Sequence, residues 1–467
     1  MEALADILQE ILAQLPVVKA EATLIITAVA LIIVGLFTTN HTILKLIYGL
    51  GILSAFIVLP RVTGEFFNGQ YLSDGISIFL KRLFLLAGIL VMLYREETER
   101  PSEYLFLFVS LMLGSFLMVS ASNFLLLYLA IEITSYSAYF LTGFRFDKKS
   151  SEGAFKYYLF GAVSSAIMLF GISLIYGATG SLDYTAITNV LGHAGFLLML
   201  MGLLFKTSVV PFHLWTPGTY EAGPTQAVAL FSVVPKLAGF GVIYQLFSLN
   251  QMRSTIVILL VLAILTIIWG TFSAIRQENA KRLISYGAIA HSGFILPLVL
   301  IDKPHMLNAF GYYAVIYALM NLSIFYFISI HEKNDIHNTR DYAGLGKVFP
   351  LLGVAGIIIF VSLVGLPPTG GFTAKLLLFT SVFRMYEWSQ DAVWLTYFAV
   401  GILSSAVSLF YYFRIPYYYF LKDKERSNIV IGRVEITIAT FFGLALFWIF
   451  IWPDNLDKFV TVILASQ

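Results

Sequence analysis

The sequence contains no cysteine, and this absence removes several kinds of chemistry. Without thiolates the chain forms no disulfide, holds no cysteine-ligated iron–sulfur cluster and uses no cysteine nucleophile. Charged residues are scarce too, at 12% of 467 residues, whereas soluble domains carry about 25%. The net charge is only +2, with no basic cluster suited to nucleic acid. A complete nucleotide-binding fingerprint, a pair of mid-span histidines for haem and a Gly/Ser-rich linker are missing as well.

Long apolar runs dominate what is present, since hydrophobic residues make up 59% of the chain. Runs of about 20 residues recur along the whole length, and each can span a hydrocarbon core of about 30 Å. The sequence therefore predicts an all-α polytopic membrane protein. We expect about fourteen transmembrane helices, near residues 22–39, 43–60, 75–94, 103–120, 122–143, 153–178, 190–213, 224–249, 254–275, 283–300, 306–330, 349–388 (interrupted), 393–417 and 434–452.

The loops between these spans differ in lysine and arginine content. Six basic residues fall in the loops on one side, and eighteen fall on the other. Because basic loops stay in the cytoplasm, we expect both chain termini on the outer side. The first fifteen residues carry leucine and isoleucine at helical spacing, which predicts an amphipathic helix at the membrane interface or against a partner.

Five basic residues remain inside the predicted spans. Lys81 and Arg82 lie two turns into their span, so their long side chains could reach the outer interface. Lys206, Lys236 and Lys375 lie deeper, where an ammonium group costs roughly 2.5–3.5 kcal/mol on insertion scales. Three such lysines favour ion translocation over a purely structural role.

A helix-breaking proline adjoins each of the three deep lysines. A broken transmembrane helix frees backbone carbonyls and is tolerated where it lines a polar cavity. We therefore expect helix breaks at these lysines, at Pro211, Pro235, Pro367 and Pro368.

Two further titratable residues lie in the middle of predicted spans. Glu132 is a carboxylate that either finds a cation, for which the deep lysines are candidates, or stays neutral and hydrogen-bonded to a neighbouring helix. His291 suits a proton relay because histidine titrates near neutral pH, although a packing role stays open. Tyr317 and Asn321 follow one turn apart in the next span.

The two strongest interruptions fall on the seventh and twelfth predicted helices. They are five spans apart, and an odd separation reverses the topology, as in the inverted repeats of secondary transporters. We expect an N-terminal region with the amphipathic helix and helices 1–3, two inverted five-helix repeats (helices 4–8 and 9–13), and a cytoplasmic loop with helix 14. Their boundaries fall at residues 1–100, 101–250, 251–420 and 421–467.

Three stretches resemble the antiporter-like subunits of respiratory complex I. "GLLFKTSVVPFHLWTPGTYEAGPTQAVALFSVVPKLAGF" (202–240) is similar to their seventh and eighth helices. "RQENAKRLISYGAIAHSGFILP" (276–297) and "SLVGLPPTGGFTAKLLLF" (362–379) are similar to their tenth and twelfth helices. The "PFHLWTP" motif resembles that of the N-type subunit, the counterpart of mitochondrial NADH dehydrogenase subunit 2. Gly218, where many relatives have Asp, and "EAGP" in place of "EGAP" depart from the pattern.

The resemblance assigns roles to the central charges. Glu132 matches the family's fifth-helix glutamate and Lys206 its partner on the broken seventh helix. Lys236 matches the connecting lysine of the eighth helix, and Lys375 matches the terminal lysine of the twelfth. With His291 as a relay, these residues are expected to carry protons.

The implied function is that of a proton-translocating membrane-arm subunit of NADH:quinone oxidoreductase. The chain is then a non-redox subunit of an enzyme, in a bacterial inner membrane with periplasmic termini. No cofactor or metal is expected in it, since FMN, iron–sulfur clusters and quinone would belong to partner subunits. The expected partners are other membrane-arm subunits and lipid, without nucleic acid. A subunit of an Mrp-type Na⁺/H⁺ antiporter, or a mainly structural link in the membrane arm, are the alternatives.

Overall fold

The computed structural model of the chain describes residues 14–60, 63–96, 98–186, 190–250, 252–424 and 429–464. The amphipathic helix predicted at the start of the sequence lies outside these residues, except for its last two positions. The chain forms two compact units. The first contains the residues up to Thr207, Val234–Asn250 and the end of the chain from Thr461, and the second contains Ser208–Val233 and Gln251–Val460.

The chain crosses from one unit to the other close to two of the deep lysines that the sequence analysis identified. One crossing falls between Thr207 and Ser208, directly after Lys206. The next falls between Val233 and Val234, directly before Pro235 and Lys236. The division into four sequence regions stays a prediction.

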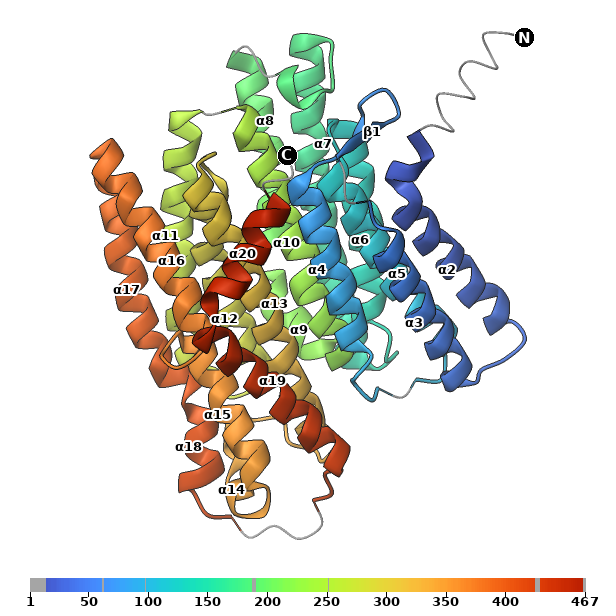
Figure 1. Ribbon diagram of the computed structural model, residues 1–467, viewed down its shortest axis with the longest axis vertical. Coiled ribbons are helices and arrows are strands. Elements are labelled where there is room, and N and C mark those ends of the chain that lie inside the picture. Colours follow the sequence, from blue (N-terminus) through green and yellow to red (C-terminus); the bar gives the residue numbers. More distant parts are fainter. Residues whose placement is uncertain are drawn as a thin grey trace. The chain divides into compact units, whose positions relative to one another are not determined.

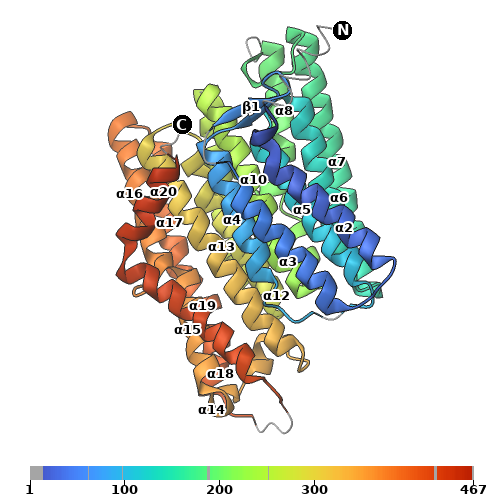
Figure 2. The same ribbon diagram turned by 45° about the vertical axis from the view of Figure 1, so that its right-hand side comes forward.

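The first unit is a helical bundle with a small β-hairpin (Figure 1). Its elements are η1 (Leu15–Val18), α2 (Lys19–Gly35), α3 (His41–Val58), β1 (Gly64–Phe66), β2 (Tyr71–Ser73), α4 (Gly75–Val91), α5 (Pro101–Ser120), α6 (Phe124–Thr142), α7 (Lys148–Thr179), η2 (Tyr184–Ala186), α8 (Val190–Thr207) and the second part of α10 (Thr225–Leu249). The antiparallel hairpin pairs Gly64 with Ser73 and Phe66 with Tyr71. Helices α2 and α3 lie side by side against α5 (Figure 2), while α6 packs on α5 and α7, and α8 packs on α7.

Local sequence sets the ends of α7. Asp147 precedes the helix, and its carboxylate accepts a hydrogen bond of 2.7 Å from the backbone amide of Ser150. This bond stabilises the charged form and lowers the pKa of Asp147 below its ordinary value. The helix ends at Gly180, whose φ of 70° lies in the left-handed region that favours glycine.

The second unit is helical throughout the part that the structure describes. Its elements are α9 (Trp215–Ala222), the first part of α10, α11 (Arg253–Ile275), α12 (Ala280–Ile295), η3 (Leu296–Val299), α13 (Pro304–Glu332), η4 (Thr339–Tyr342), α14 (Leu345–Val348), α15 (Pro350–Val364), α16 (Gly370–Ser389), α17 (Ala392–Tyr412), α18 (Arg414–Leu421), α19 (Arg433–Ile451) and most of α20 (Pro453–Leu464). Helix α11 packs on α12 and α17, α13 packs on α16, and α15 packs on α19. The short helix α9 packs against α12.

Among the described residues, eleven helical segments are long and apolar enough to cross a membrane. The predicted spans outside this set are the third, which forms the 17-residue α4, and the seventh and twelfth, which carry the two strongest predicted interruptions. Both breaks are confirmed, since one falls between α8 and α9 and the other between α15 and α16. The exact number of spans stays a prediction.

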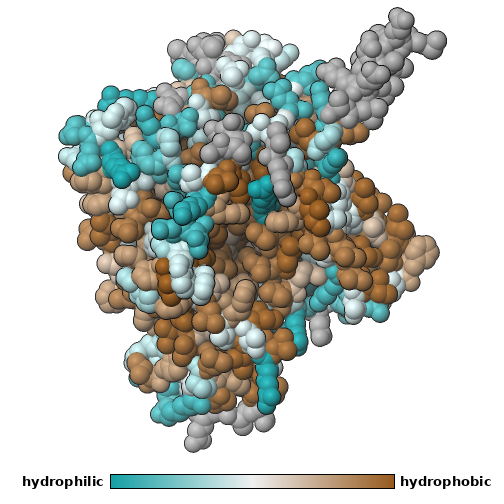
Figure 3. Space-filling model, viewed as in Figure 1, coloured by the Kyte–Doolittle hydropathy of each residue, from teal (hydrophilic) through white to brown (hydrophobic). Residues whose placement is uncertain are grey.

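The outer faces of the helices are apolar. On α2, for example, Ile25, Ile26, Val29 and Ile33 are all at least half exposed. Figure 3 shows one face of the molecule, on which hydrophobic side chains (brown) cover most of the surface and hydrophilic ones (teal) form smaller patches. Exposed apolar helix faces of this kind are typical of contact with a hydrocarbon core.

Candidate functional site

The first break separates α8 from α9. Helix α8 ends at Thr207 because Ser208 has a left-handed φ of 60°, and the next peptide bond to proline, Val210–Pro211, is cis. Backbone and side-chain groups at the break form other hydrogen bonds. The amide of Val210 donates to the hydroxyl of Thr266 on α11 at 3.0 Å, and the hydroxyl of Thr216 donates to that of Ser208 at 2.8 Å.

Lys206 stands one residue before the end of α8. It is 1% exposed, and its ammonium nitrogen has no hydrogen-bond partner among the described residues. The Glu132 carboxylate on α6 acts electrostatically on it, while Glu132 itself is half-buried and accepts a hydrogen bond from the Ser165 hydroxyl on α7. The pairing of Glu132 with a deep lysine stays a prediction, and the hydrogen bond from α7 is the alternative that the sequence left open.

Lys236 is also buried, at 1% exposure, but the predicted helix break beside it is wrong. Helix α10 runs without interruption from Thr225 to Leu249, with Pro235 in its interior. Transmembrane helices tolerate proline where neighbouring helices supply alternative hydrogen bonds. Here the hydroxyl of Tyr317 donates to the carbonyl of Ser232 at 3.0 Å, next to the Phe231 carbonyl that Pro235 leaves without its helical donor.

The second break separates α15 from α16. Gly365, with a φ of 84°, ends α15, and the Pro367–Pro368 peptide bond that follows is cis. Lys375 reaches back to this break from α16. Its ammonium group donates to the carbonyl of Val364 at 2.7 Å and to the hydroxyl of Ser405 at 3.2 Å, and lies 4.7 Å from the ring centre of Phe294. Lys375 therefore binds a backbone carbonyl at the end of the broken helix.

His291 lies in an aromatic environment on α12. Its Nδ1 shares a hydrogen bond of 2.8 Å with the hydroxyl of Tyr313, and the rings of Phe294, Tyr313 and Tyr317 surround it. Asn321 donates to the backbone carbonyl of Tyr317 at 2.9 Å. A histidine held by a phenol can pass a proton through that hydrogen bond.

The predicted site residues fall into two groups. Glu132, Lys206 and Lys236 belong to the first unit, and His291 and Lys375 belong to the second. Each unit therefore holds a buried lysine beside a helix break. A continuous row through all five residues stays a prediction.

Sequence reasoning missed the partners of these charges. Ser165 and Ser405 bind Glu132 and Lys375, yet serines inside spans usually bond to their own helix and give no sequence signal. Glu21 was missed too, although a carboxylate at the start of the first span, with a basic residue deep in the third, was a readable signal.

The buried ion pair of the first unit involves Glu21 and Lys81. Lys81 lies 2.8 Å from the Glu21 carboxylate and donates to the hydroxyl of Tyr71 at 2.6 Å, while Tyr71 donates to Glu21 at 2.5 Å. Both charges are almost fully buried, with 0% and 5% of their side chains exposed. Lys81 therefore does not extend to an interface, as the sequence allowed, but is paired in the interior with Glu21 and Tyr71.

Metal binding has no support from the described residues. No group of three or more His, Asp or Glu side chains within them is arranged to hold a metal ion.

Multiple apolar spans, two interrupted helices and deeply buried lysines define a class, an integral multi-pass membrane protein with an antiporter-like fold. Residues 121–403 match the family model described as NADH:quinone oxidoreductase/Mrp antiporter, transmembrane. The chain belongs to this family and, within it, to the antiporter-like subunits called subunit N of NADH-quinone oxidoreductase.

Individual relatives agree with this assignment. The chain is 32% identical to NADH-quinone oxidoreductase subunit N of Parvibaculum lavamentivorans, an alignment that covers 100% of this chain and 98% of the relative. It is 35% identical to subunit N 2 of Chloroherpeton thalassium, over 82% of this chain and 80% of the relative.

Two solved structures share the fold. A chain of respiratory complex I from Thermus thermophilus with bound aureothin matches with a TM-score of 0.81 and 29% identity, over 94% of this chain and 98% of the other. A chain of the Mrp complex from Dietzia sp. matches with a TM-score of 0.84 at 18% identity, over 97% of each chain, which shows a common fold alone.

Proposed function

We propose that the chain is a proton-translocating subunit in the membrane arm of an NADH:quinone oxidoreductase. In this proposal, protons move by way of Glu132, Lys206, Lys236, His291 and Lys375. The main support is Lys206, because its buried ammonium group has no hydrogen-bond partner among the described residues. Lys81 offers the contrast of a structural lysine, since a carboxylate and a phenol pair it directly.

Glu132 controls the charge of Lys206 in this mechanism. A nearby carboxylate stabilises an ammonium group in a region of low dielectric constant. When Glu132 moves or is neutralised, the charged lysine loses that stabilisation and releases its proton. The hydrogen bond from Ser165 holds the carboxylate toward α7, so breaking this bond would let the carboxylate move relative to Lys206.

The second unit would receive and release the proton. We propose transfer through bound water past Lys236 and His291 to Lys375. The support comes from each unit separately: His291 is hydrogen-bonded to Tyr313, and Lys375 is bound to the end of a broken helix. Charge repulsion from an incoming proton then favours release from Lys375.

The redox chemistry would belong to other subunits. The relatives are named as subunits of NADH-quinone oxidoreductase, and this chain lacks the cysteines that hold iron–sulfur clusters. We propose that partner subunits carry FMN, iron–sulfur clusters and quinone, and that quinone reduction drives proton movement here. The basic loops support a bacterial inner-membrane location with both termini on the periplasmic side.

The test uses Glu132→Gln and Lys206→Ala in the complete enzyme. NADH-driven quinone reduction and proton pumping are measured in membrane vesicles, and both are expected to fall at least about tenfold, as for loss of a proton-transfer group. Glu152→Gln is the matched control, because Glu152 is an exposed carboxylate of α7, paired with Lys156. Near-normal pumping by both test variants, in normally assembled enzyme, contradicts the proposal.

The Mrp antiporter is the second candidate. The common fold supports it, but the identity of 18% to the Mrp chain is well below the 32% and 35% to the subunit N relatives named above. Na⁺-driven proton movement without NADH would favour the antiporter. Wild-type pumping after neutralising Glu132, Lys206, Lys236 and Lys375 together would favour a structural link.

A further inference from the structure

The half-helix α9 is isolated from its neighbours in sequence. It has eight residues, with the break at residues 208–214 before it and Gly223 and Pro224 after it. Helices this short have little stability of their own in solution. The position of α9 must therefore depend on contacts with other helices.

A buried cation holds the turn that follows α9. Lys281, in the first turn of α12, donates to the backbone carbonyl of Gly223 at 2.9 Å and forms an ion pair with Glu332 at 3.1 Å. Glu332 lies at the end of α13 and accepts a hydrogen bond from the hydroxyl of Thr225, the first residue of α10. The α9–α10 turn is thus tied to two other helices at once.

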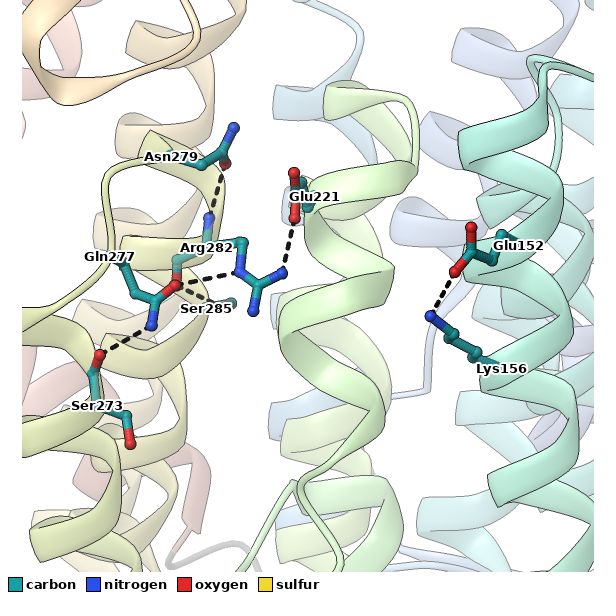
Figure 4. A network of polar contacts seen from close by, with 8 residues as sticks. All are labelled: Glu152, Lys156, Glu221, Ser273, Gln277, Asn279, Arg282 and Ser285. Atoms are coloured by element: carbon teal, nitrogen blue, oxygen red, sulfur yellow. Dashed lines mark hydrogen bonds and ion pairs between the residues drawn. The ribbon is translucent and has the colours of Figure 1, made fainter.

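A second ion pair lies beside the first. Arg282 binds the carboxylate of Glu221, in the last turn of α9, at 3.1 Å (Figure 4). The Nε of Arg282 donates to the side chain of Gln277 at 3.1 Å, which orients the guanidinium group. These residues form what we call the α9–α10 clamp, which consists of Glu221, Gly223, Thr225, Lys281, Arg282 and Glu332.

The burial of the clamp argues for a positional role. Only 5% of the Lys281 side chain and 14% of the Glu332 side chain are exposed. Buried ion pairs add little net stability compared with apolar side chains of the same size, because desolvation opposes the attraction. A buried pair at a turn between two helices is better explained by the geometry that it imposes.

The clamp contacts two helices, α12 and α13, that also carry or contact residues of the proposed proton path. Helix α12 carries His291 ten residues after Lys281, about 15 Å along the axis. Helix α13 carries Tyr317, which binds the first part of α10 at Ser232. The same two helices thus hold the relay histidine, the half-helix after the break and the part of α10 that leads to Lys236.

We propose that Lys281, Arg282 and Glu332 are positioning residues for proton translocation. By clamping the α9–α10 turn to α12 and α13, they fix the half-helix that follows Lys206. This inference rests on the proposed function of the chain.

The experiment compares Lys281→Met with Lys281→Arg in the purified complete enzyme. The methionine has similar length but neither charge nor donor, whereas arginine keeps both. Amide hydrogen exchange of residues 215–224 is measured by mass spectrometry, and the number of protons pumped per electron is measured in vesicles. For Lys281→Met we expect exchange at least about tenfold faster and fewer protons per electron, and for Lys281→Arg near-wild-type values.

Lys156→Ala is the matched control, because it removes a lysine from an exposed ion pair on α7, drawn in the same view (Figure 4). It should change neither quantity. If Lys281→Met does not assemble, Arg282→Gln replaces it, since the Arg282 pair is more exposed and its loss is easier to tolerate.

Two results overturn the inference. Unchanged exchange in the test variant shows that the clamp does not hold α9. Faster exchange with an unchanged proton-to-electron ratio shows that the position of α9 does not matter for transport, and leaves the proposed function intact. A failure of the proposed function would instead show itself as near-normal pumping in both Glu132→Gln and Lys206→Ala.

Discussion

Replacing Gly365 with alanine is expected to displace Lys375. Gly365 has a φ of 84°, a conformation that costs other residues about 1–2 kcal/mol. A Cβ atom here would lie 2.5 Å from Cδ and 3.1 Å from Cε of Lys375, so the lysine side chain must move. Its hydrogen bond to Val364, 2.7 Å long, would then weaken, and bonds from charged donors contribute about 1.5–3 kcal/mol.

Gly180→Ala separates the effect of backbone strain from the effect of the contact with Lys375. Gly180 also ends a helix with a left-handed φ, of 70°, but a Cβ there meets nothing within 4 Å. Proton pumping and assembly of the complete enzyme are measured for both variants. We expect Gly180→Ala to pump nearly normally and Gly365→Ala to lose about tenfold or more, since 1.4 kcal/mol corresponds to a factor of ten. Equal pumping by the two variants would refute the reasoning, because the contact with Lys375 would then have no consequence.

Three further predictions concern other contacts. Lys81→Met should destabilise the enzyme by about 3–5 kcal/mol in thermal melts, since it strands the buried Glu21, whereas adding Glu21→Leu should restore most of the loss. Asp147→Ala should cost about 0.5–2 kcal/mol at neutral pH. Because folding lowers the pKa of Asp147, its stabilisation is complete above the unfolded value of about 3.9 and is lost as the pH falls, so the difference between mutant and wild-type melts should shrink in acid. Tyr313→Phe removes a hydrogen bond from His291, and pumping should fall about two- to tenfold for a bond of about 0.5–1.5 kcal/mol.

Each of these expectations has a contrary result. A double variant at Glu21 and Lys81 that melts as low as Lys81→Met would show that packing, not charge, dominates there. A pH-independent effect of Asp147→Ala would show that its carboxylate does not act as the cap. Normal pumping by Tyr313→Phe would remove Tyr313 from the proposed relay.

The fold was predictable from its long apolar runs, and the two helix breaks were predictable because lysine and proline are unusual within such runs. In an apolar run that spans a membrane, a lysine followed by a proline stands out, and both predicted interruptions at Pro211 and at Pro367–Pro368 coincide with real helix ends. Pro235 looked the same in sequence but lies inside a continuous helix. Its effect depends on neighbours such as Tyr317, which local sequence does not reveal.

Side-chain partners were much less predictable than helices. Lys81 was predicted to be able to reach an interface, because its partner Glu21, 2.8 Å away in the structure, lies two predicted spans earlier in the sequence. Ser165 and Ser405 resemble ordinary small residues of packed helices. The α9–α10 clamp joins residues of four helices, so it becomes visible only when α9, α10, α12 and α13 are placed together.

The clamp also has a consequence for how the protein is made. Chains enter the membrane from the N-terminus as they are synthesised. Gly223 emerges 58 residues before Lys281, which binds its carbonyl, and Thr225 emerges 107 residues before Glu332. The half-helix α9 is thus inserted long before the side chains that hold it exist. Its final position is set only after α13 has left the ribosome. The structure around the break beside Lys206 is therefore completed by folding of the second unit and not by the order of synthesis.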